Sequence, residues 1–222
     1  MEEHIVKILS IEKVTHDVKK ITVEKPEGYG FIPGQATEVA VNKINYKDKK
    51  RPFTFTGLNE WKNLEFTIKI YKDHNGITDE IGKLIPGDEL IIHDVWGAIN
   101  YKGHGVFIAA GAGVTPFIAI FRDLKRKNDL KMNKLIFSNK TSDDIILKNE
   151  FIEILGENFI NLLTREKNNE YRFGRINESF LKEQIIDFNQ NFYICGPDKF
   201  VQEINSILVK LGARPDSVVF ES

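Results

Sequence analysis

The sequence contains a single cysteine, Cys195, among its 222 residues. One cysteine excludes an internal disulfide framework, a multi-cysteine zinc site and an iron–sulfur cluster held by four thiolates of this chain. No apolar run approaches the ~20 residues that a membrane helix needs, and Met1-Glu2-Glu3-His4 lacks the features of a signal peptide. The net charge of −1 gives no indication of nucleic acid or an anionic membrane as a partner. We therefore expect a cytoplasmic protein that binds neither nucleic acid nor a membrane.

The pattern of predicted elements changes once, near residues 100–105. Before this point, short β-branched segments separated by Pro-Gly turns predict a small antiparallel β-barrel. After it, apolar strands alternate with helices, which predicts an α/β domain with a five-stranded parallel sheet. The expected barrel strands are 5–8, 18–23, 36–41, 64–70 and 89–93, with a helix at 78–84. The expected parallel strands are 106–110, 134–138, 159–163, 192–195 and 218–220, with helices at 116–127, 147–155, 178–187 and 198–211.

The most informative segment is Gly111-Ala112-Gly113-Val114-Thr115-Pro116, between a predicted buried strand and a predicted helix. Thr115 suits the cap of that helix, and Pro116 suits its first turn, where no backbone N–H is needed. The glycines let a ligand approach the backbone where the helix N-terminus offers its N–H groups, which suits a pyrophosphate. A tight strand-to-helix turn without a ligand uses the same residue types, so the motif alone leaves both interpretations open.

Arg51-Pro52-Phe53-Thr54 is a second candidate, on a predicted strand. Arg51 could bind a phosphate, Phe53 could stack on a planar ring and Thr54 could form a hydrogen bond with a ring heteroatom. An exposed arginine on a half-buried strand is the plainer alternative.

Two further segments lie at the starts of predicted helices. Asn75-Gly76-Ile77-Thr78 precedes the short helix and could hold a second phosphate, although a hydroxyl-capped helix explains it equally well. Cys195-Gly196-Pro197 ends a parallel strand, so Cys195 should stand at the carboxyl edge of the sheet, where such sheets bind ligands. A buried structural cysteine is the alternative.

In this order, the motifs resemble those of the ferredoxin–NADP reductase family of flavoproteins. That family carries Arg-x-Tyr-Ser on a flavin-binding barrel, then Gly-x-Gly-x-Thr/Ser-Pro and Cys-Gly-Pro on a nicotinamide-nucleotide domain. The resemblance covers nearly the whole chain. It implies a flavin-binding barrel domain at 1–99 and an NAD(P)-binding α/β domain at 100–222.

The resemblance also implies roles for individual residues. On the flavin, Arg51 would hold a phosphate, Phe53 would lie against the ring system and Thr54 would form a hydrogen bond near N5. Cys195 would lie beside the hydride-donating carbon of the nicotinamide, and Glu221 resembles an acidic residue that relays protons or contacts a partner. Lys69, Ile70 and Tyr71 would line the flavin through backbone and ring contacts, and Gly76, Ile77 and Thr78 would meet its pyrophosphate. Gly111 to Pro116, Gly196 and Pro197 would hold the nucleotide.

Two departures from the family pattern are visible. Phe53 and Thr54 replace a tyrosine and a serine, which removes a hydroxyl and crowds the N5 contact. The sequence ends at Ser222 without the C-terminal aromatic of plant-type members, so we expect less gated access of nicotinamide to the flavin.

The resemblance implies hydride transfer from NAD(P)H to bound FAD, followed by electron transfer to a separate carrier, ferredoxin or flavodoxin. A reductase of free flavin is one alternative. A non-catalytic flavin-binding electron-transfer subunit is another, although Thr54, Thr115 and Cys195 stand where hydride transfer needs them.

A preference for NADPH over NADH is predicted from the ends of two parallel strands. Phe137-Ser138-Asn139-Lys140 has no acid to accept the ribose 2′-hydroxyl of NADH. Thr164-Arg165-Glu166, followed by Gly174-Arg175-Ile176, resembles the segment with which bacterial relatives hold the 2′-phosphate. Arg165 and Arg175 are therefore the predicted phosphate ligands, unless Arg165 pairs with Glu166 or Glu170 instead.

Overall fold

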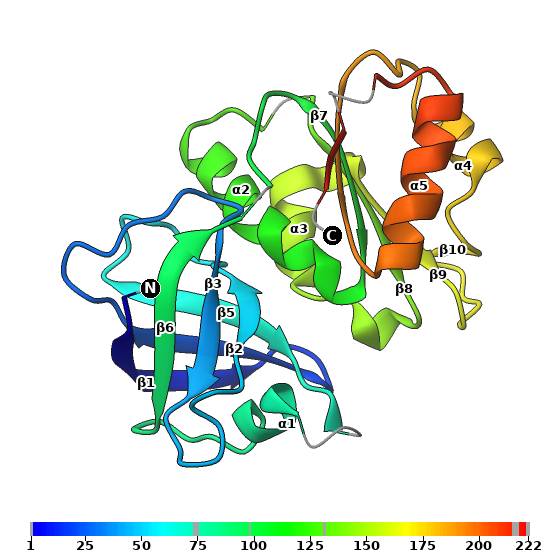
Figure 1. Ribbon diagram of the computed structural model, residues 1–222. Helices are drawn as coiled ribbons and strands as arrows, with labels where there is room; N and C mark the ends of the chain where they lie inside the picture. The colour runs from blue at the N-terminus through cyan, green and yellow to red at the C-terminus, as the bar shows by residue number, and fades with distance from the viewer. Residues whose placement is uncertain (1, 73–75, 98, 131, 215–217, 221–222) are drawn as a thin grey trace. The chain divides into compact units, whose positions relative to one another are not determined.

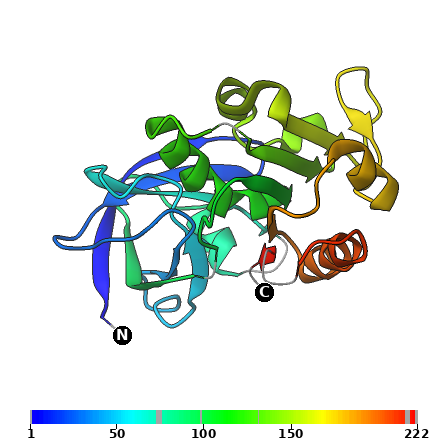
Figure 2. The same cartoon turned by 90° about the horizontal axis from the view of Figure 1, so that it is seen from above.

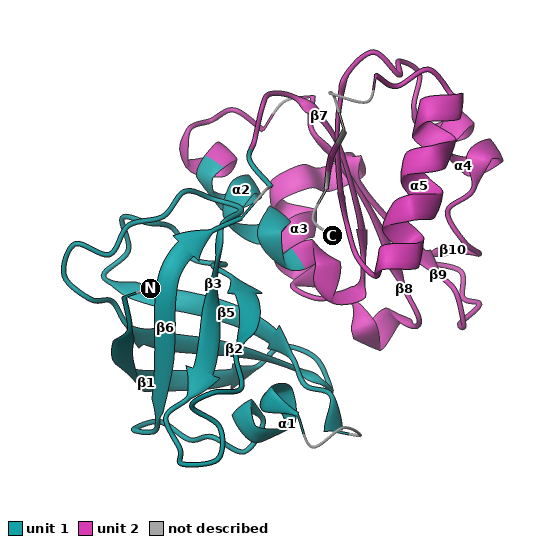
Figure 3. Ribbon diagram, in the orientation of Figure 1, with its two compact units in different colours: residues 1–100, 115–123 teal, residues 101–114, 124–222 magenta. Residues whose placement is uncertain are grey.

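The computed structural model describes residues 2–72, 76–97, 99–130, 132–214 and 218–220 (Figure 1). The chain forms two compact units, residues 1–100 with 115–123 and residues 101–114 with 124–222 (Figure 3). Their functional assignment as a flavin-binding domain at 1–99 and a nucleotide-binding domain at 100–222 stays a prediction.

The first unit contains a six-stranded antiparallel sheet in the order β4-β3-β6-β1-β2-β5. An antiparallel bridge between Phe55 and Phe66 joins the residue after β4 to β5 and so links the two outer strands. The predicted barrel is confirmed. Its strands are β1 (His4–Lys13), β2 (Val18–Glu24), β3 (Ala36–Val41), β4 (Arg51–Thr54), β5 (Asn63–Lys69) and β6 (Glu89–Trp96).

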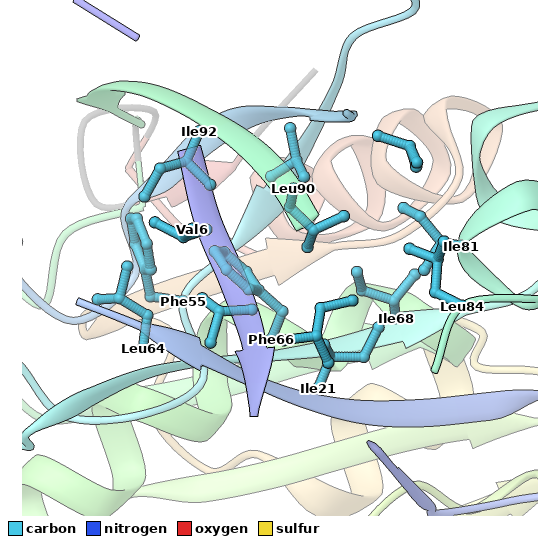
Figure 4. Close-up of a cluster of buried hydrophobic side chains, with 14 of the residues drawn as sticks. Val6, Ile21, Phe55, Leu64, Phe66, Ile68, Ile81, Leu84, Leu90 and Ile92 are labelled. Carbon is cyan, nitrogen blue, oxygen red and sulfur yellow. The ribbon is translucent and has the colours of Figure 1, made fainter. Parts of the chain in front are cut away.

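The barrel core is built by alternate residues of each strand, because successive side chains of a strand point to opposite faces. In β5, for example, Leu64, Phe66 and Ile68 all enter the core (Figure 4). The short helix α1 (Ile77–Ile81) adds Ile77 and Ile81 to the same cluster. This helix begins one residue earlier than predicted and ends before Gly82.

The second unit contains a parallel sheet in the order β10-β9-β8-β7-β11-β12. The predicted five-stranded parallel sheet is confirmed. A sixth strand, β10, adds an edge; it was not predicted because two residues are too few to show a strand period. The strands are β7 (Gly105–Ala110), β8 (Lys134–Asn139), β9 (Phe159–Leu163), β10 (Arg172–Phe173), β11 (Asn191–Cys195) and β12 (Val218–Phe220).

The predicted helices of the second half are present as α2 (Thr115–Arg126), α3 (Lys148–Leu155), α4 (Glu178–Gln184) and α5 (Asp198–Lys210). Buried residues of α4 and α5 pack with Val106, Ile108 and Ile136 on one face of the sheet. Figure 2 shows the backbone of the same elements from above. Among the described residues, no helix is both long and apolar enough to traverse a membrane. The cytoplasmic location stays a prediction.

The order of the strands defines one switch point in the parallel sheet. From β7 the chain moves to β8 and β9 on one side, and later places β11 on the other side of β7. In such sheets the ligand crevice lies at the carboxyl ends of the strands where the order reverses. The carboxyl ends of β7 and β11 are therefore the expected ligand edge.

Candidate functional site

The glycine turn follows β7 directly at this switch point. It forms a short 3₁₀ helix, Gly111–Val114, which continues into α2 at Thr115. The expectation that Thr115 precedes the helix as its cap is therefore corrected, since Thr115 is the first residue of α2. Pro116 follows inside the first turn, where its missing N–H costs no helical hydrogen bond.

Gly111 and Gly113 are present in the turn for different structural reasons. Gly111 has φ +53°, and a Cβ built on it would meet no heavy atom of the described residues within 4 Å. A Cβ on Gly113 would lie 2.3 Å from the carbonyl oxygen of Cys195. Gly113 is therefore needed for the backbone after β7 to pass the end of β11. Of the two glycines, Gly111 has open space in its Cβ direction among the described residues.

The end of β11 forms the other side of this contact. Cys195 is half-buried, and its backbone is paired with that of Ala109 of β7. A Cβ on Gly196 would lie 2.8 Å from the ring of Phe200, so glycine lets the first turn of α5 fold close to the strand end. Pro197 directly precedes α5. The Gly111 turn and the Cys195-Gly196-Pro197 segment thus meet at the switch point.

The alternative partners of Arg165 are engaged elsewhere. The carboxylate of Glu166 accepts the backbone N–H of Ser142 at 2.7 Å, and this hydrogen bond is the main cause that lowers the pKa of Glu166. The carboxylate of Glu170 pairs with Lys148 at 2.8 Å. The guanidinium groups of Arg165 and Arg175 are exposed, and neither forms an ion pair or hydrogen bond within the described part of the chain.

The short strand β10 brings these two arginine segments together. It pairs with Leu162 and Leu163, the last residues of β9, and the N–H of Gly174 donates to the carbonyl of Leu163 at 2.8 Å. The segment that contains Arg175 therefore lies beside the end of β9, from which Arg165 follows. Only the parallel pairing of β10 with β9 reveals this proximity.

The end of β8 is fixed by residues that the sequence analysis missed. The side chain of Asp144 accepts hydrogen bonds from the N–H and the hydroxyl of Thr141, at 2.9 Å and 2.7 Å. This is a capping box, and Glu166 holds the adjacent Ser142. The Thr-x-x-Asp pattern was a readable signal for it.

In the first unit, Arg51 opens β4 with an exposed side chain. Its Nη1 donates to the carbonyl of Lys50 at 2.9 Å, and it has no ion pair among the described residues. Phe53 is half-buried and packs against the barrel core, while Thr54 is buried at the end of β4. The guanidinium is thus available to an anion, whereas part of the Phe53 ring is already covered by protein.

The segment that follows β5 offers one exposed group. Lys69 pairs with Asp17 at 2.8 Å, and Ile70 is buried in the core. The side chain of Tyr71 is 50% exposed, and its N–H donates to the hydroxyl of Thr78 at 3.4 Å. This hydrogen bond joins the two segments, 69–71 and 76–78, that the family resemblance assigns to the flavin.

The start of α1 differs from the hydroxyl-capped alternative. Gly76 precedes the helix and forms no side-chain cap, and Ile77 is buried. The first-turn acids Asp79 and Glu80 pair with Lys83 and Lys43 at 2.8 Å each. The predicted residues Asn75 and Glu221 lie outside the described part of the structure.

Known sequences match both the nucleotide unit and most of the chain. The profile of an oxidoreductase NAD-binding domain matches residues 107–206. NADH-cytochrome b5 reductase 2 of Mycosarcoma maydis is 26% identical over 243 residues, which cover 94% of this chain and 69% of that protein. The flavohemoprotein of Bacillus subtilis (strain 168) is 29% identical over 125 residues, 52% of this chain and 31% of that protein. This chain thus spans only part of the length of both relatives.

Solved structures share the whole two-domain fold. The FAD/NAD-binding domain of a nitric oxide dioxygenase from Vibrio cholerae O1 biovar El Tor has a TM-score of 0.87 at 17% identity, over 98% of this chain and 97% of that one. A ferredoxin NADP⁺ reductase from Neisseria gonorrhoeae, with FAD and NADP bound, has a TM-score of 0.85 at 19% identity, over 100% and 98%.

An antiparallel barrel followed by a parallel sheet with a glycine turn at its switch point defines a two-domain oxidoreductase fold. Residues 107–206 match an oxidoreductase NAD-binding domain, and the chain as a whole has the fold of ferredoxin–NADP reductase-like flavoproteins.

Proposed function

We propose that this chain is an NAD(P)H-dependent FAD oxidoreductase that passes electrons to a separate one-electron carrier. One observation carries the proposal: the Gly111 turn, with open space at Gly111, meets the Cys195 end of β11 at the switch point. A nicotinamide nucleotide suits this place because a pyrophosphate is stabilised at the N-terminus of a helix. When bound, FAD accepts a hydride and releases electrons one at a time, which is chemistry that no side chain supplies.

The residues of this chain then bind and orient. The N–H groups at the start of α2 hold the nucleotide pyrophosphate, and Arg165 and Arg175 hold the 2′-phosphate of NADPH. Arg51 holds a phosphate of FAD, because its exposed guanidinium has no ion pair with any described residue and so gives up no known salt bridge when an anion binds. Tyr71, held by Thr78, lines the flavin.

We infer that the electrons leave these 222 residues, because one cysteine cannot hold a four-thiolate iron–sulfur cluster. Ferredoxin or flavodoxin stays the predicted carrier. The relatives are named cytochrome b5 reductase and flavohemoprotein, so a haem protein such as cytochrome b5 is included in the same test.

Anaerobic stopped-flow mixing with NADPH or NADH tests the proposal. We expect a yellow protein whose flavin absorbance near 450 nm, roughly where oxidised flavins absorb, bleaches on mixing. Ferredoxin, flavodoxin, cytochrome b5 and free flavin are then added separately to the reduced protein. A colourless protein that reduces only added flavin would favour the free-flavin reductase, and bound flavin that neither nucleotide bleaches would favour the non-catalytic subunit.

Arg51→Ala is expected to weaken FAD binding by about ten- to a hundredfold, because a charge-assisted hydrogen bond contributes roughly 1.5–3 kcal/mol. Fluorescence titration of the flavin-free protein with FAD measures the effect. Lys47→Ala removes an exposed charge from the loop before β4 and serves as the control. A wild type without flavin absorbance, even after incubation with FAD, would contradict the assignment.

Cys195→Ser is expected to slow flavin reduction about three- to tenfold, which is about 0.7–1.4 kcal/mol of activation free energy. The two side chains are nearly isosteric and Cys195 is only half-buried, so the melting temperature should change little. Stopped flow and thermal melts are measured on the same preparations. A variant that melts much earlier yet reduces flavin at the normal rate would identify Cys195 as a structural residue.

A further inference from the structure

Arg122 of α2 makes a buried ion pair with the barrel. Its Nη1 donates to Oε1 of Glu65 at 2.6 Å and to the carbonyl oxygen of Thr56 at 2.7 Å. The two charged side chains are only 12% and 9% exposed. The guanidinium also lies 5.4 Å from the ring centroid of Trp61, within cation–π range. One residue of α2 is thus fixed by three groups of the barrel.

The barrel residues around Arg122 are themselves held in place. The hydroxyl of Thr56 donates to the same oxygen of Glu65 at 2.8 Å and lies 3.1 Å from the hydroxyl of Thr67. A Cβ on Gly57 would lie 2.8 Å from the ring of Trp61, so glycine is needed for this ring to lie there. The Arg122 socket is therefore Thr56, Gly57, Trp61, Glu65 and Thr67.

Stability alone does not explain a buried ion pair on this helix. Replacing such a pair by apolar residues of similar volume is often neutral or stabilising, because the charges lose their hydration. α2 already buries Phe117, Ile118 and Phe121 fully, so it has apolar side chains enough for packing. Arg122 instead fixes the orientation of α2. Two hydrogen bonds from one guanidinium nitrogen can both form at only one rotation and one axial position of the helix.

Arg122 and Glu65 belong to the two elements, α2 and β5, that lead to the proposed nucleotide and flavin sites. α2 continues from the Gly111–Val114 turn, and β5 continues from Glu65 to the segment 69–71. Both Arg122 and Glu65 lie in the first compact unit (Figure 3). We propose that Arg122 is a positioning residue that, through Glu65, fixes the register of α2 against β5 for hydride transfer without touching nucleotide or flavin. The inference rests on the proposed function.

Hydride transfer is sensitive to such a register because the reacting atoms must stand about 3–3.5 Å apart, and a 1 Å misplacement costs up to about a hundredfold. A positioning residue should therefore change the rate constant of the chemical step at saturating nucleotide. It should leave the flavin content of the protein unchanged and the dissociation constant of the nucleotide within about threefold of that of the wild type.

The test is single-turnover reduction of the flavin-loaded protein by saturating NADPH and NADH. We expect Arg122→Met, Arg122→Lys and Glu65→Gln each to slow flavin reduction at least about tenfold. Lys125→Met is the matched control, because it removes an exposed ion pair, with Glu153, from the same helix and should change nothing.

A double variant, Arg122→Met with Glu65→Leu, guards against simple unfolding. It replaces the ion pair by an apolar pair, so we expect the melting temperature lost in Arg122→Met to return while flavin reduction stays slow. Recovery of both the melting temperature and the rate of flavin reduction in the double variant would show that the role of Arg122 is purely structural, and would overturn the inference. Single variants that fold normally and reduce flavin at the wild-type rate would overturn it as well. A wild type that neither nucleotide reduces overturns the proposed function and the inference together.

Discussion

Gly113→Ala is expected to lower the free energy of unfolding by at least about 2 kcal/mol. The new Cβ would lie 2.3 Å from the carbonyl oxygen and 2.5 Å from the carbonyl carbon of Cys195. Both atoms are backbone at the end of a central strand, so no flexible side chain can move aside. The turn and the strand must separate, and urea unfolding followed by circular dichroism measures the cost.

Gly111→Asn is the comparison for this variant. Gly111 has φ +53°, a conformation that asparagine tolerates better than most residues, and its Cβ direction is open. We therefore expect a stability loss below about 1 kcal/mol. Nucleotide affinity should nevertheless fall at least about tenfold, because the side chain fills the space proposed for the pyrophosphate. Unchanged nucleotide binding in calorimetric titrations of Gly111→Asn would remove the turn from the binding site.

Replacing Arg165 and Arg175 together by alanine is expected to reduce kcat/KM for NADPH at least about tenfold and to leave NADH nearly unchanged. Each arginine-to-phosphate contact contributes roughly 1.5–3 kcal/mol, and NADH lacks the phosphate. Both guanidinium groups are exposed, and neither has an ion pair among the described residues, so no existing salt bridge is lost. Steady-state kinetics with both nucleotides measure the difference.

Arg172→Ala controls for loss of charge at β10. Arg172 lies in β10, three residues before Arg175, but it pairs with Glu183 and stands 4.9 Å from the ring of Phe180. We expect its replacement to affect the two nucleotides equally. Equal losses of kcat/KM for the two nucleotides when Arg165 and Arg175 are both replaced, or a wild type that already prefers NADH, would contradict the prediction.

The sequence predicted the elements because their signals are local. Alternation in β5 and the apolar runs of β7 and β11 arise from neighbouring residues, and the structure places each strand where the pattern does. Thr115 was predicted to precede the helix as its cap, but the 3₁₀ turn Gly111–Val114 continues directly into α2, which begins at Thr115. The order of the motifs along the chain also predicted the family, because each motif is read within a few residues.

The contacts that decide the site could not be predicted in this way, because they join residues far apart in the chain. The ammonium of Lys69 is paired with Asp17, 52 positions earlier in the chain, while the flavin-lining role of Lys69 stays a prediction. Arg122 gave no signal, because its partner Glu65 is 57 positions away. The ligand role of Gly113 stays a prediction, and the parallel pairing of β7 with β11 shows why glycine is needed there, because the Cys195 backbone fills the place of a Cβ.

By itself, the sequence determined the kind of each element, the barrel followed by a parallel sheet, and the turn at which a nucleotide is expected. Hydrophobic period and turn residues act over a few positions and need no partner to be recognised. The tertiary structure decided which lysine and arginine side chains form ion pairs, which glycine has open space in its Cβ direction, and which helix is fixed to the barrel. These outcomes depend on strand order and register, which bring distant residues into contact and which no local pattern encodes.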